Sequence, residues 1–406
     1  MAAASKTTFI PKSYSHCASC IGTHGVGRRA AGGGGADLRM DGVDSNHVDA
    51  PGFDLGWLDL SDLDVSLTMV DSIRKVPVDD WNRVARASSA DGHANPFVTW
   101  EFLNALEESA SVHRDTGWTS RHMLVTDLLS REIIGCVPMY LKAHSYGEYV
   151  FDHNWARAYR SFEPAGGGGY YPKLQCCVPF TPVTGPRFLT RGDPDQRRRA
   201  QAAMHEALET VCVKTGLSSA HVTFPPRAEW LALGQRGYLQ RTGIQYHWEN
   251  RGYTTFDQFL ASLRQSRRKR IRQERNKIIK AGITVKRLRG ADIEADHWEA
   301  FFQFYLNTVD DKWGQAYLTR DFFRILGRDM RDSCLLVLAH DSTGALLAGA
   351  LHLLGGNSLY GRNWGCSKKV DSLHFELCYY QAIEAAIEMS LVRVEAGAQG
   401  EHKIAR

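Results

Sequence analysis

The sequence lacks long hydrophobic runs: no apolar stretch approaches the roughly 18 residues that a membrane-spanning helix needs. Hydrophobic residues nevertheless make up 43% of the chain, and ten of them are tryptophan. This composition is typical of a soluble globular protein. With 406 residues the chain is long enough for two domains, each of which can bury its own core.

Cysteine is scarce and scattered, with nine residues in the whole chain. The adjacent Cys176 and Cys177 have no second pair at the spacing of a zinc site, and the same holds for Cys17 and Cys20. We therefore expect no disulfide framework, no metal site and a reducing compartment.

Three common catalytic signatures are also missing. The chain contains no G-x-S-x-G nucleophile elbow, no H-E-x-x-H zinc motif and no phosphate-binding P-loop. The sequence therefore does not predict a serine hydrolase of that type, a zinc peptidase or a P-loop nucleotide hydrolase.

Positive charge is concentrated in one segment. The formal net charge is +4, but residues 264–280 hold nine basic residues and the single acid Glu274, a net of +8, so the rest carries 4 − 8 = −4. Three interpretations stay open: a solvated helix, an anion site for the phosphates of a substrate or a tRNA, and a nuclear signal or DNA contact. No zinc-finger, homeodomain or basic-zipper spacing supports sequence-specific DNA binding.

The same segment is predicted to form a helical arm, because apolar residues before and within it can share one helical face while the basic residues project away. These apolar residues are Phe256, Phe259, Leu260, Leu263, Ile271 and Ile278.

The first 36 residues have the composition of an organelle transit peptide. They contain four basic residues and no acid, are rich in Ala, Ser, Thr and Gly, and lack the apolar core of a secretory signal. The hydroxyl-rich, arginine-poor start favours the plastid stroma over a mitochondrion, and an inert tail is the alternative. Residues 37–66 are rich in aspartate, which predicts a disordered linker.

A pattern of helix, antiparallel strands, helix and strand occurs twice in the rest of the chain, which predicts two similar α+β domains in tandem. The first copy comprises the stretches 97–110, 121–142, 193–216 and 220–224. The second comprises 297–308, 320–330, 334–354, 358–363, 371–391 and 392–397. In the helix at 193–216, Asp193 can cap the start, Pro194 suits the first turn and Gly216 can end it.

The two copies differ at their ends. After its last strand the first copy continues through residues 225–252, which look like a short helix and two more strands, whereas the second copy stops soon after Gly397. We therefore expect a second domain that lacks its C-terminal part, with an unpaired edge at its last strand.

Several strings in this region resemble those of a known family. They are HSYGEYVFD (144–152), YYPKL (170–174), FTPVTGPR (180–187), QYHWENRGY (245–253), DDKWGQAYL (310–318), GRNWGC (361–366), LHFELCYYQAIE (373–384) and EAGAQGEHK (395–403). Together with the basic run, they make residues 70–406 similar to the FemAB-like branch of the GNAT acyltransferase superfamily, whose members are often labelled peptidoglycan biosynthesis proteins.

The resemblance implies an α+β fold of two tandem GNAT-like domains, with mixed, mostly antiparallel sheets flanked by helices. The expected organisation is a transit peptide at 1–36, a linker at 37–66, a first domain at 67–255, the basic helical arm at 256–282 and a shortened second domain at 283–406. It also implies an N-acyltransferase or aminoacyltransferase, which moves the acyl group from acyl-CoA or aminoacyl-tRNA to an amine by direct attack and binds no further cofactor.

The sequence departs from simple GNAT enzymes in the loop that holds the CoA pyrophosphate. Neither copy has a Gln/Arg-x-x-Gly-x-Gly/Ala loop; the equivalent places read TRGDPDQ and SKKVDSLHFE. The second still offers Lys368, Lys369 and free helix NH groups to an anion, so both donor classes stay open.

Direct amide formation needs a group that accepts a proton and donors for the carbonyl oxygen. Candidate bases lie at or near the last strand and at the start of the preceding helix: Glu395, Glu401, His402, His374 and Glu376, the last of which is alternatively a first-turn acid favoured by the helix dipole. Candidate substrate-binding residues come from the aromatic stretch after residue 143, from the arm, from the second helix start and from GRNWG. They are Tyr146, Glu148, Asp152, Lys269, Arg270, Arg272, Lys368, Lys369 and Arg362.

Two other functions remain open. The chain could be an RNA-binding protein that reuses the fold, with binding that falls steeply as salt rises, or a scaffold without catalysis. The expected partners are an anionic donor and an amine acceptor, without a membrane span and without sequence-specific DNA.

Overall fold

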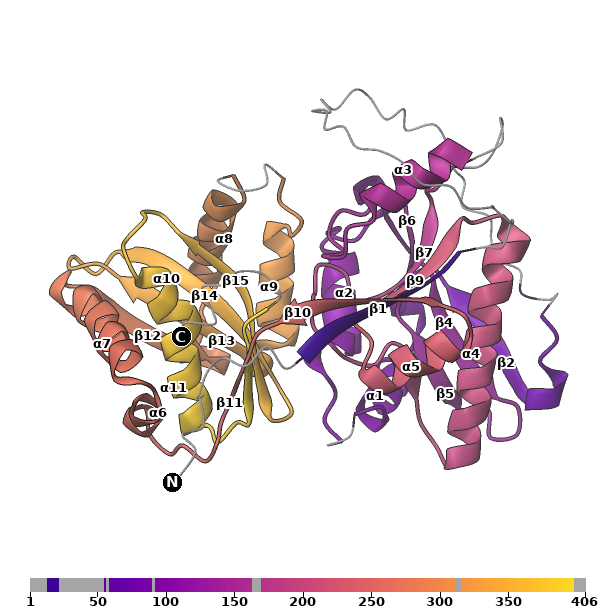
Figure 1. The fold of residues 1–406 in the computed structure, drawn as a ribbon, viewed down its shortest axis with the longest axis horizontal. Helices are drawn as coiled ribbons and strands as arrows, with labels where there is room; N and C mark the ends of the chain where they lie inside the picture. Colours follow the sequence, from indigo (N-terminus) through magenta and orange to yellow (C-terminus); the bar gives the residue numbers. More distant parts are fainter. Residues whose placement is uncertain are drawn as a thin grey trace.

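The computed structural model describes residues 13–21, 55, 58–89, 92–162, 169–310 and 315–397, with the first of these ranges described by its backbone alone. Two α+β domains lie side by side and are joined by the strands β10 and β11 (Figure 1). Their sheets are mixed and mostly antiparallel, and helices flank them. The fold class predicted from the sequence is therefore confirmed.

The first domain contains two sheets, with the strand orders β10-β1-β9-β7-β6-β3 and β2-β4-β5-β8. The strands are β1 Ser13–Ile21, β2 Val65–Val70, β3 Trp118–Ser120, β4 His122–Asp127, β5 Ile133–Val137, β6 Met139–Lys142, β7 Lys173–Cys176, β8 Leu189–Thr190, β9 Ser219–Thr223 and β10 Leu239–Gln245. The helices are α1 Val78–Ala87, α2 Trp100–Glu108, α3 His153–Phe162, α4 Pro194–Thr215 and α5 Arg227–Gln235.

Strand β1 lies within the range predicted to be a transit peptide, between β9 and β10 and antiparallel to both. Strand β2 begins at Val65, inside the range predicted to be a linker, and Leu60 before it is buried. The targeting function of residues 1–36 stays a prediction.

The ends of α4 are set by the residues that the sequence analysis named. Asp193 accepts a hydrogen bond from the backbone NH of Gln196, Pro194 occupies the first turn, and Gly216 adopts the left-handed conformation with φ 69°. This φ is costly for a residue with a Cβ, so glycine is suited to the position. The predicted caps are confirmed.

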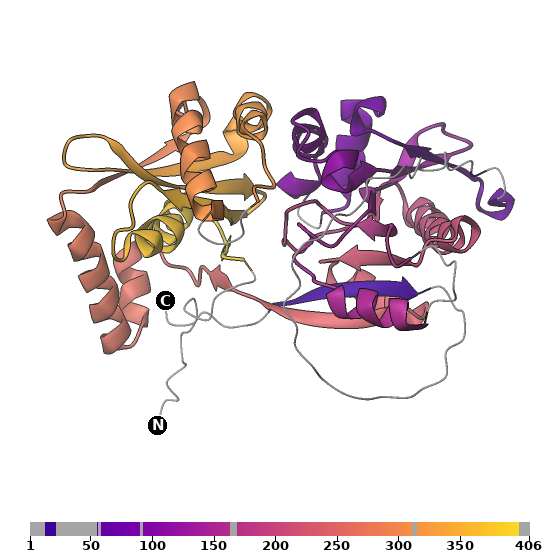
Figure 2. The same ribbon diagram turned by 90° about the horizontal axis from the view of Figure 1, so that it is seen from above.

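The second domain has one sheet, with the order β11-β16-β15-β14-β13-β12. Its strands are β11 His247–Glu249, β12 Thr284–Arg289, β13 Cys334–His340, β14 Leu346–Gly355, β15 Ser358–Cys366 and β16 Arg393–Glu395. Its helices are α6 Phe256–Ser262, α7 Gln265–Lys280, α8 Ala295–Asp310, α9 Arg320–Asp329, α10 Leu373–Phe375, the π-helix η7 Glu376–Tyr380 and α11 Gln381–Glu388. Helices α8 and α9 cover one face, and α10, η7 and α11 cover the other, with α6 and α7 beside them (Figure 2).

The prediction of an unpaired edge at β16 is wrong. Strand β11 pairs antiparallel with β16, joining His247 to Glu395 and Glu249 to Arg393, while β15 pairs on its other side. The chain therefore covers this edge with a strand that comes from about 145 residues earlier in the sequence. Such a pairing requires a distant segment, so strand patterns near β16 could not predict it.

The two domains share one hydrophobic core. The ring of Phe102 on α2 lies 5.9 Å from that of Phe322 on α9, and the ring of Phe97 lies 5.3 Å from that of Tyr360 on β15. These residues belong to a single buried cluster that extends through both domains. The domains are therefore held together by core packing, which fixes the walls of any site between them.

None of the helices within the described ranges is long and apolar enough to cross a membrane.

Candidate active site between the domains

Strands β15 and β16 run parallel and then separate. Residues 358–360 of β15 pair with residues 393–395 of β16, where β16 ends, and β15 continues beside β14 to Cys366. The carboxyl ends of two parallel strands therefore open a gap, which is where open α/β sheets commonly bind ligands. The π-helix η7 lies next to this gap, and short π-helical turns are frequent at functional sites.

A cavity of about 520 Å³ fills this gap and reaches the first domain. This volume lies in the range of small-molecule sites. The cavity is lined by Gly147, Tyr149, Phe151, Phe180, Tyr305, Thr308, Val309, Gln315, Tyr317, Leu318, Ala350, Leu351, His352, Gly361, Arg362, Asn363, Trp364, His374, Cys378, Tyr379 and Ala396. Of the residues predicted to form a site, His374 and Arg362 lie in this lining.

His352 on β14 is the buried polar residue of the cavity wall whose bonding is incomplete. Its side chain is 1% exposed, and its Nδ1 has no hydrogen-bond partner among the described residues. Burial lowers the pKa of its imidazole to about 4, so the ring is neutral near pH 7. A neutral imidazole nitrogen without a partner is ready to accept a hydrogen bond from a ligand.

Aromatic rings form most of the wall that faces the first domain. The rings of Phe180 and Tyr317 are stacked 5.3 Å apart. Phe180 comes from the first domain and Tyr317 from the second. The hydroxyl of Tyr305 accepts hydrogen bonds from the backbone NH groups of Tyr317 and Leu318. These bonds hold the chain after residues 311–314 against α8. Burial also raises the pKa of Tyr305 to about 12, so it is a neutral phenol.

A second aromatic group lies on the η7 side. The ring of His374 is 5.2 Å from that of Trp364 and 5.5 Å from that of Tyr379. The imidazole of His374 is therefore oriented by two rings inside the cavity wall.

Arg362 on β15 ties the cavity wall to the first domain. Its guanidinium donates hydrogen bonds to the backbone carbonyl of Phe180 and to Thr181 Oγ1, and lies 5.0 Å from the centre of the Phe97 ring. Its charge is thus engaged by the first domain, and its pKa is lowered by burial. The sequence predicted this residue as a substrate contact; the structure shows it lining the cavity and bridging the domains.

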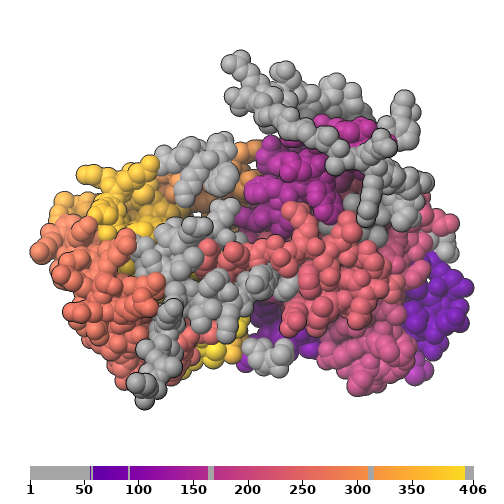
Figure 3. Space-filling view, viewed as in Figure 1, coloured from indigo at the N-terminus to yellow at the C-terminus, as the bar shows by residue number. Residues whose placement is uncertain are grey.

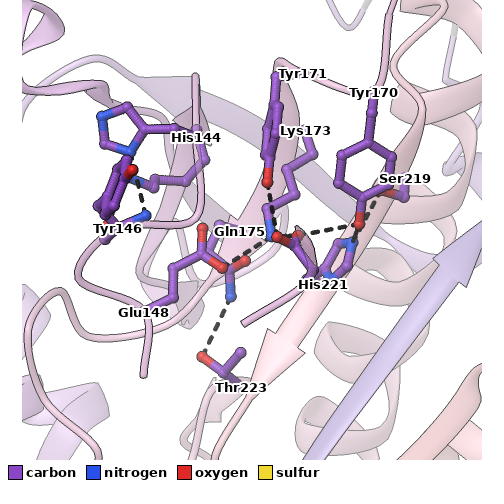
Figure 4. Close-up of polar contacts among 12 residues, drawn as sticks. His144, Tyr146, Glu148, Tyr170, Tyr171, Lys173, Gln175, Ser219, His221 and Thr223 are labelled. Atoms are coloured by element: carbon purple, nitrogen blue, oxygen red, sulfur yellow. Dashed lines mark hydrogen bonds and ion pairs between the residues drawn. The ribbon is translucent and has the colours of Figure 1, made fainter. Parts of the chain in front are cut away.

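Beneath the first-domain wall lies a buried charge network (Figure 4). Lys173 Nζ donates to Glu148 Oε2 at 2.8 Å and to Asp152 Oδ2. The Tyr171 hydroxyl donates to the other oxygen of Asp152 at 2.7 Å. The Tyr170 hydroxyl donates to Asp152 at 3.0 Å and lies 3.2 Å from His221 Nε2. Each of the three charged side chains is at most 4% exposed.

The pKa values of this network follow from burial and from Lys173. Burial raises the pKa of Glu148 to about 6, although Lys173 opposes the rise. Burial also acts to raise the pKa of Asp152, but Lys173 and the tyrosine hydrogen bond outweigh it and leave the pKa at about 2. Both carboxylates in turn raise the pKa of Lys173 against its own burial. The network is therefore a lysine held between two carboxylates.

The network fixes the loop that forms part of the cavity wall. Gly147 and Tyr149 line the cavity on either side of Glu148, whose side chain turns inward to Lys173. Glu148 and Asp152 were predicted as substrate contacts; the structure buries both beneath the wall. Tyr146, the third residue predicted there, is 42% exposed and packs against the ring of His144.

The equivalent place in the first domain is filled by its own side chains. Strands β7 and β9 are also parallel, but the buried guanidinium of Arg187 donates to the carbonyls of Val183, Gly185 and Thr223 beside their ends. Gln175 and Thr223 hydrogen bond to each other there at 3.2 Å. The open gap between parallel strands therefore belongs to the second domain.

The basic arm lies on the outer side of the second domain, where α7 forms the edge of the molecule away from the first domain (Figure 3). Lys269, Arg270 and Arg272 are exposed, and none of them is among the residues that line the cavity. Arg270 pairs with Glu274 at 3.0 Å. Lys368 and Lys369 are exposed in the loop between β15 and α10.

Three of the other predicted bases lie at the end of the second domain, whereas Glu376 begins η7. Glu395 is the last residue of β16, and its side chain is 6% exposed beside His247, one residue before Ala396 of the cavity wall. Glu401 and His402 lie outside the described residues. Within the described residues there is also no group of three His, Cys, Asp or Glu side chains that could hold a metal ion.

His352 and Tyr305 were not predicted from the sequence as site residues. His352 stands inside the apolar strand sequence AGALHLL, where a histidine is commonly a core residue. Tyr305 follows the helical spacing of a buried face. A spacing rule cannot mark either of them, because the cavity exists only once the strands separate and the first domain closes over it.

Two α+β domains in tandem, each with a parallel strand pair beside a long helix, define the GNAT type of fold. A family model for FemAB-like proteins, described as peptidoglycan biosynthesis/recognition, matches residues 72–406. The chain therefore belongs to the FemAB-like family, which confirms the resemblance drawn from its motifs.

Several solved structures are similar to the chain at low identity. FemX is 11% identical over 82% of this chain and 89% of that chain, with a TM-score of 0.46. A tandem GNAT protein from the clavulanic acid biosynthesis pathway is 11% identical over 82% and 89%, with a TM-score of 0.40. The Saccharomyces cerevisiae N-myristoyltransferase with bound myristoyl-CoA is 11% identical over 81% and 76%, with a TM-score of 0.37. None of the curated proteins matches the chain.

Proposed function

We propose that the protein is an N-acyltransferase or aminoacyltransferase whose reaction takes place in the cavity between the domains. The observation that carries this proposal is the cavity at the separated ends of β15 and β16, with the unpaired Nδ1 of the neutral His352 in its wall. Membership of the FemAB-like family supports the same class of reaction.

The reaction is a direct transfer. The amine nitrogen attacks the acyl carbonyl, a C–N bond forms, and the bond from the carbonyl carbon to the sulfur or oxygen of the donor breaks. The proton lost by the amine leaves with the thiol or hydroxyl of the donor. His352 Nδ1 accepts an N–H hydrogen bond from the incoming amine and so orients its lone pair, since a pKa of about 4 keeps the imidazole neutral.

Two donor classes fit this proposal, acyl-CoA and aminoacyl-tRNA. Lys368 and Lys369 are exposed in the loop before α10, which supports a role for them in binding the phosphates of either donor. Lys269, Arg270 and Arg272 are exposed on α7, outside the cavity lining, and suit the longer polyanion. The composition of residues 1–36 supports action in the plastid stroma, with a mitochondrion as the alternative.

Filling the cavity is expected to weaken acyl-dependent binding. Thr308 lines the cavity from α8 and is partly buried, so Thr308→Trp places an indole in the space of the ligand. We expect the thermal midpoint of the wild type to rise with acyl-CoA or charged tRNA. The affinity of Thr308→Trp for the same donor is expected to fall at least about tenfold, a change of roughly 1.4 kcal/mol.

The control is Gln303→Trp, an exposed position on the same helix that is not part of the cavity. Free CoA and uncharged tRNA at two salt concentrations separate the acyl group from its carrier. Shifts with any polyanion that high salt removes would identify an RNA-binding protein instead. The absence of any shift would favour a scaffold.

A separate substitution tests the role of His352. His352→Leu removes the hydrogen-bond acceptor, while His352→Asn keeps one near the position of Nδ1. We expect kcat/KM for the acceptor amine to fall about tenfold in the leucine variant, as for one lost hydrogen bond. We expect it to be largely retained in the asparagine variant, with donor affinity unchanged in both. Equal losses in the two variants would contradict the proposed contact.

A further inference from the structure

A second groove, of about 510 Å³, lies on the other side of η7 from the cavity. It is bounded by α6, α7, the start of β12 and the segment from η7 to α11. Apolar side chains form part of its lining, among them Phe256, Ile279 and Ile283, and Ile279 is 70% exposed. The lining also carries carboxylates, amides and guanidinium groups.

The charges that line the groove do not balance. Asp257, Glu376 and Glu384 contribute −3 and Arg272 and Arg275 contribute +2, which leaves −3 + 2 = −1. Arg272 lies 3.5 Å from Asp257, and Arg275 donates to Glu384 Oε2 at 2.9 Å. Arg275 also lies 3.1 Å from Glu376, so Glu376 and Glu384 share this single guanidinium and one negative charge remains unbalanced.

The carboxylate of Glu376 is buried, and only one of its two oxygens has a hydrogen-bond partner among the described residues. Glu376 is 4% exposed. Its Oε1 accepts from Gln381 Nε2 at 2.8 Å and lies 3.1 Å from Arg275 Nη2, while its Oε2 has no hydrogen-bond partner among the described residues. A buried carboxylate oxygen without a donor is costly, so the groove is suited to a ligand that brings an N–H group and one positive charge.

We propose that this groove binds a small organic monocation: a primary ammonium ion on a short alkyl chain. The ammonium donates to Glu376 Oε2, and the alkyl chain packs against Phe256, Ile279 and Ile283. Glu376 is the first residue of η7, and Cys378 and Tyr379 of the same short helix line the cavity. The groove and the cavity therefore share one wall, through which an occupant of the groove contacts the helix that shapes the cavity.

The binding is tested by calorimetric titration of the full chain with n-butylammonium chloride, with 1-butanol and sodium butyrate as the neutral and anionic matches. We expect the wild type to bind the ammonium ion and neither of the others. Glu376→Gln keeps the shape of the side chain and is expected to bind at least tenfold more weakly. Asp321→Asn on α9, an exposed carboxylate away from the groove, is expected to bind as the wild type does.

A second variant keeps the test valid if Glu376→Gln does not fold. Ile279→Trp fills the groove from its exposed apolar wall without touching Glu376, and it is also expected to bind at least tenfold more weakly. Equal binding by 1-butanol, unchanged binding by either groove variant, or no binding by the wild type would each overturn the proposal. The titration needs no transferase activity, so failure of the proposed function would leave its result unaffected.

Discussion

Replacing Lys173 with methionine is expected to lower the free energy of unfolding by about 3–5 kcal/mol, the cost of breaking a buried ion pair from one side. The substitution keeps the length of the side chain but leaves Glu148 and Asp152 buried without their shared cation. Tyr171 still donates to Asp152, but Glu148 Oε2 loses the donor it has in the wild type. A carboxylate left buried in this way costs more than the apolar side chain gains.

Urea unfolding at several pH values measures this loss. Without Lys173 the pKa values of both carboxyl groups rise in the folded protein above their unfolded values, so the variant loses stability as pH rises. The difference in free energy of unfolding between the wild type and the variant is therefore expected to be larger at pH 8 than at pH 5. Lys286→Met, at an exposed position on β12, is the control and is expected to change little. An equal, small effect of both substitutions would mean that the network does not hold the loop.

The sequence predicted those parts of the fold that depend on neighbouring residues. The caps of α4 follow from contacts within a few turns and are found in the structure. The six apolar residues of the arm are all buried as predicted, but they do not share one helical face, because the segment forms two helices, α6 and α7, separated at the extended Leu263. The pairing of β11 with β16 was missed because its two strands are far apart in the chain. A prediction from local patterns has no information on which distant strand covers an edge.

The candidate site was predicted in part, for a related reason. The stretch from His144 to Asp152 was predicted to supply substrate-binding residues, among them Glu148 and Asp152. The structure places these two carboxylates around Lys173, which comes from the separate string YYPKL, so both bind an internal cation. Residue types revealed a polar cluster, but only the pairing of β6 with β7, which sets Lys173 opposite Lys142, brings this lysine beside the stretch.

Glu395→Gln is expected to stabilise the protein, increasingly as pH rises. Glu395 is buried at the end of β16, its Oε2 3.8 Å from His247 Nε2 and its Oε1 3.8 Å from Arg393. Burial raises the pKa of its carboxyl from 4.5 to about 7, although Arg393 opposes the rise. Burial lowers the pKa of His247 to about 4, so this neighbour is neutral over most of the same range.

The sign of the effect follows from proton binding. Between pH 4.5 and 7 the folded wild type keeps the proton that its unfolded state has released, so its stability falls as pH rises. The rise of the Glu395 pKa from 4.5 to about 7 corresponds to about 3 kcal/mol. The stability of Glu395→Gln relative to the wild type is therefore expected to increase by about 3 kcal/mol from pH 4 to pH 8. The titration of His247 occurs in both proteins and cancels in the comparison.

Chemical denaturation across this pH range measures the stability, and transfer assays on the same samples test the predicted role of Glu395 as a base. Glu395 precedes Ala396 of the cavity wall, and a carboxyl pKa near 7 suits a general base. If Glu395 accepts the proton of the amine, the variant becomes more stable but its kcat falls. The increase of kcat with pH near pH 7 that the wild type shows is then also lost. If its carboxyl is only a buried group, the variant becomes more stable and transfers at the wild-type rate, and the cavity reaction depends on His352 and on water.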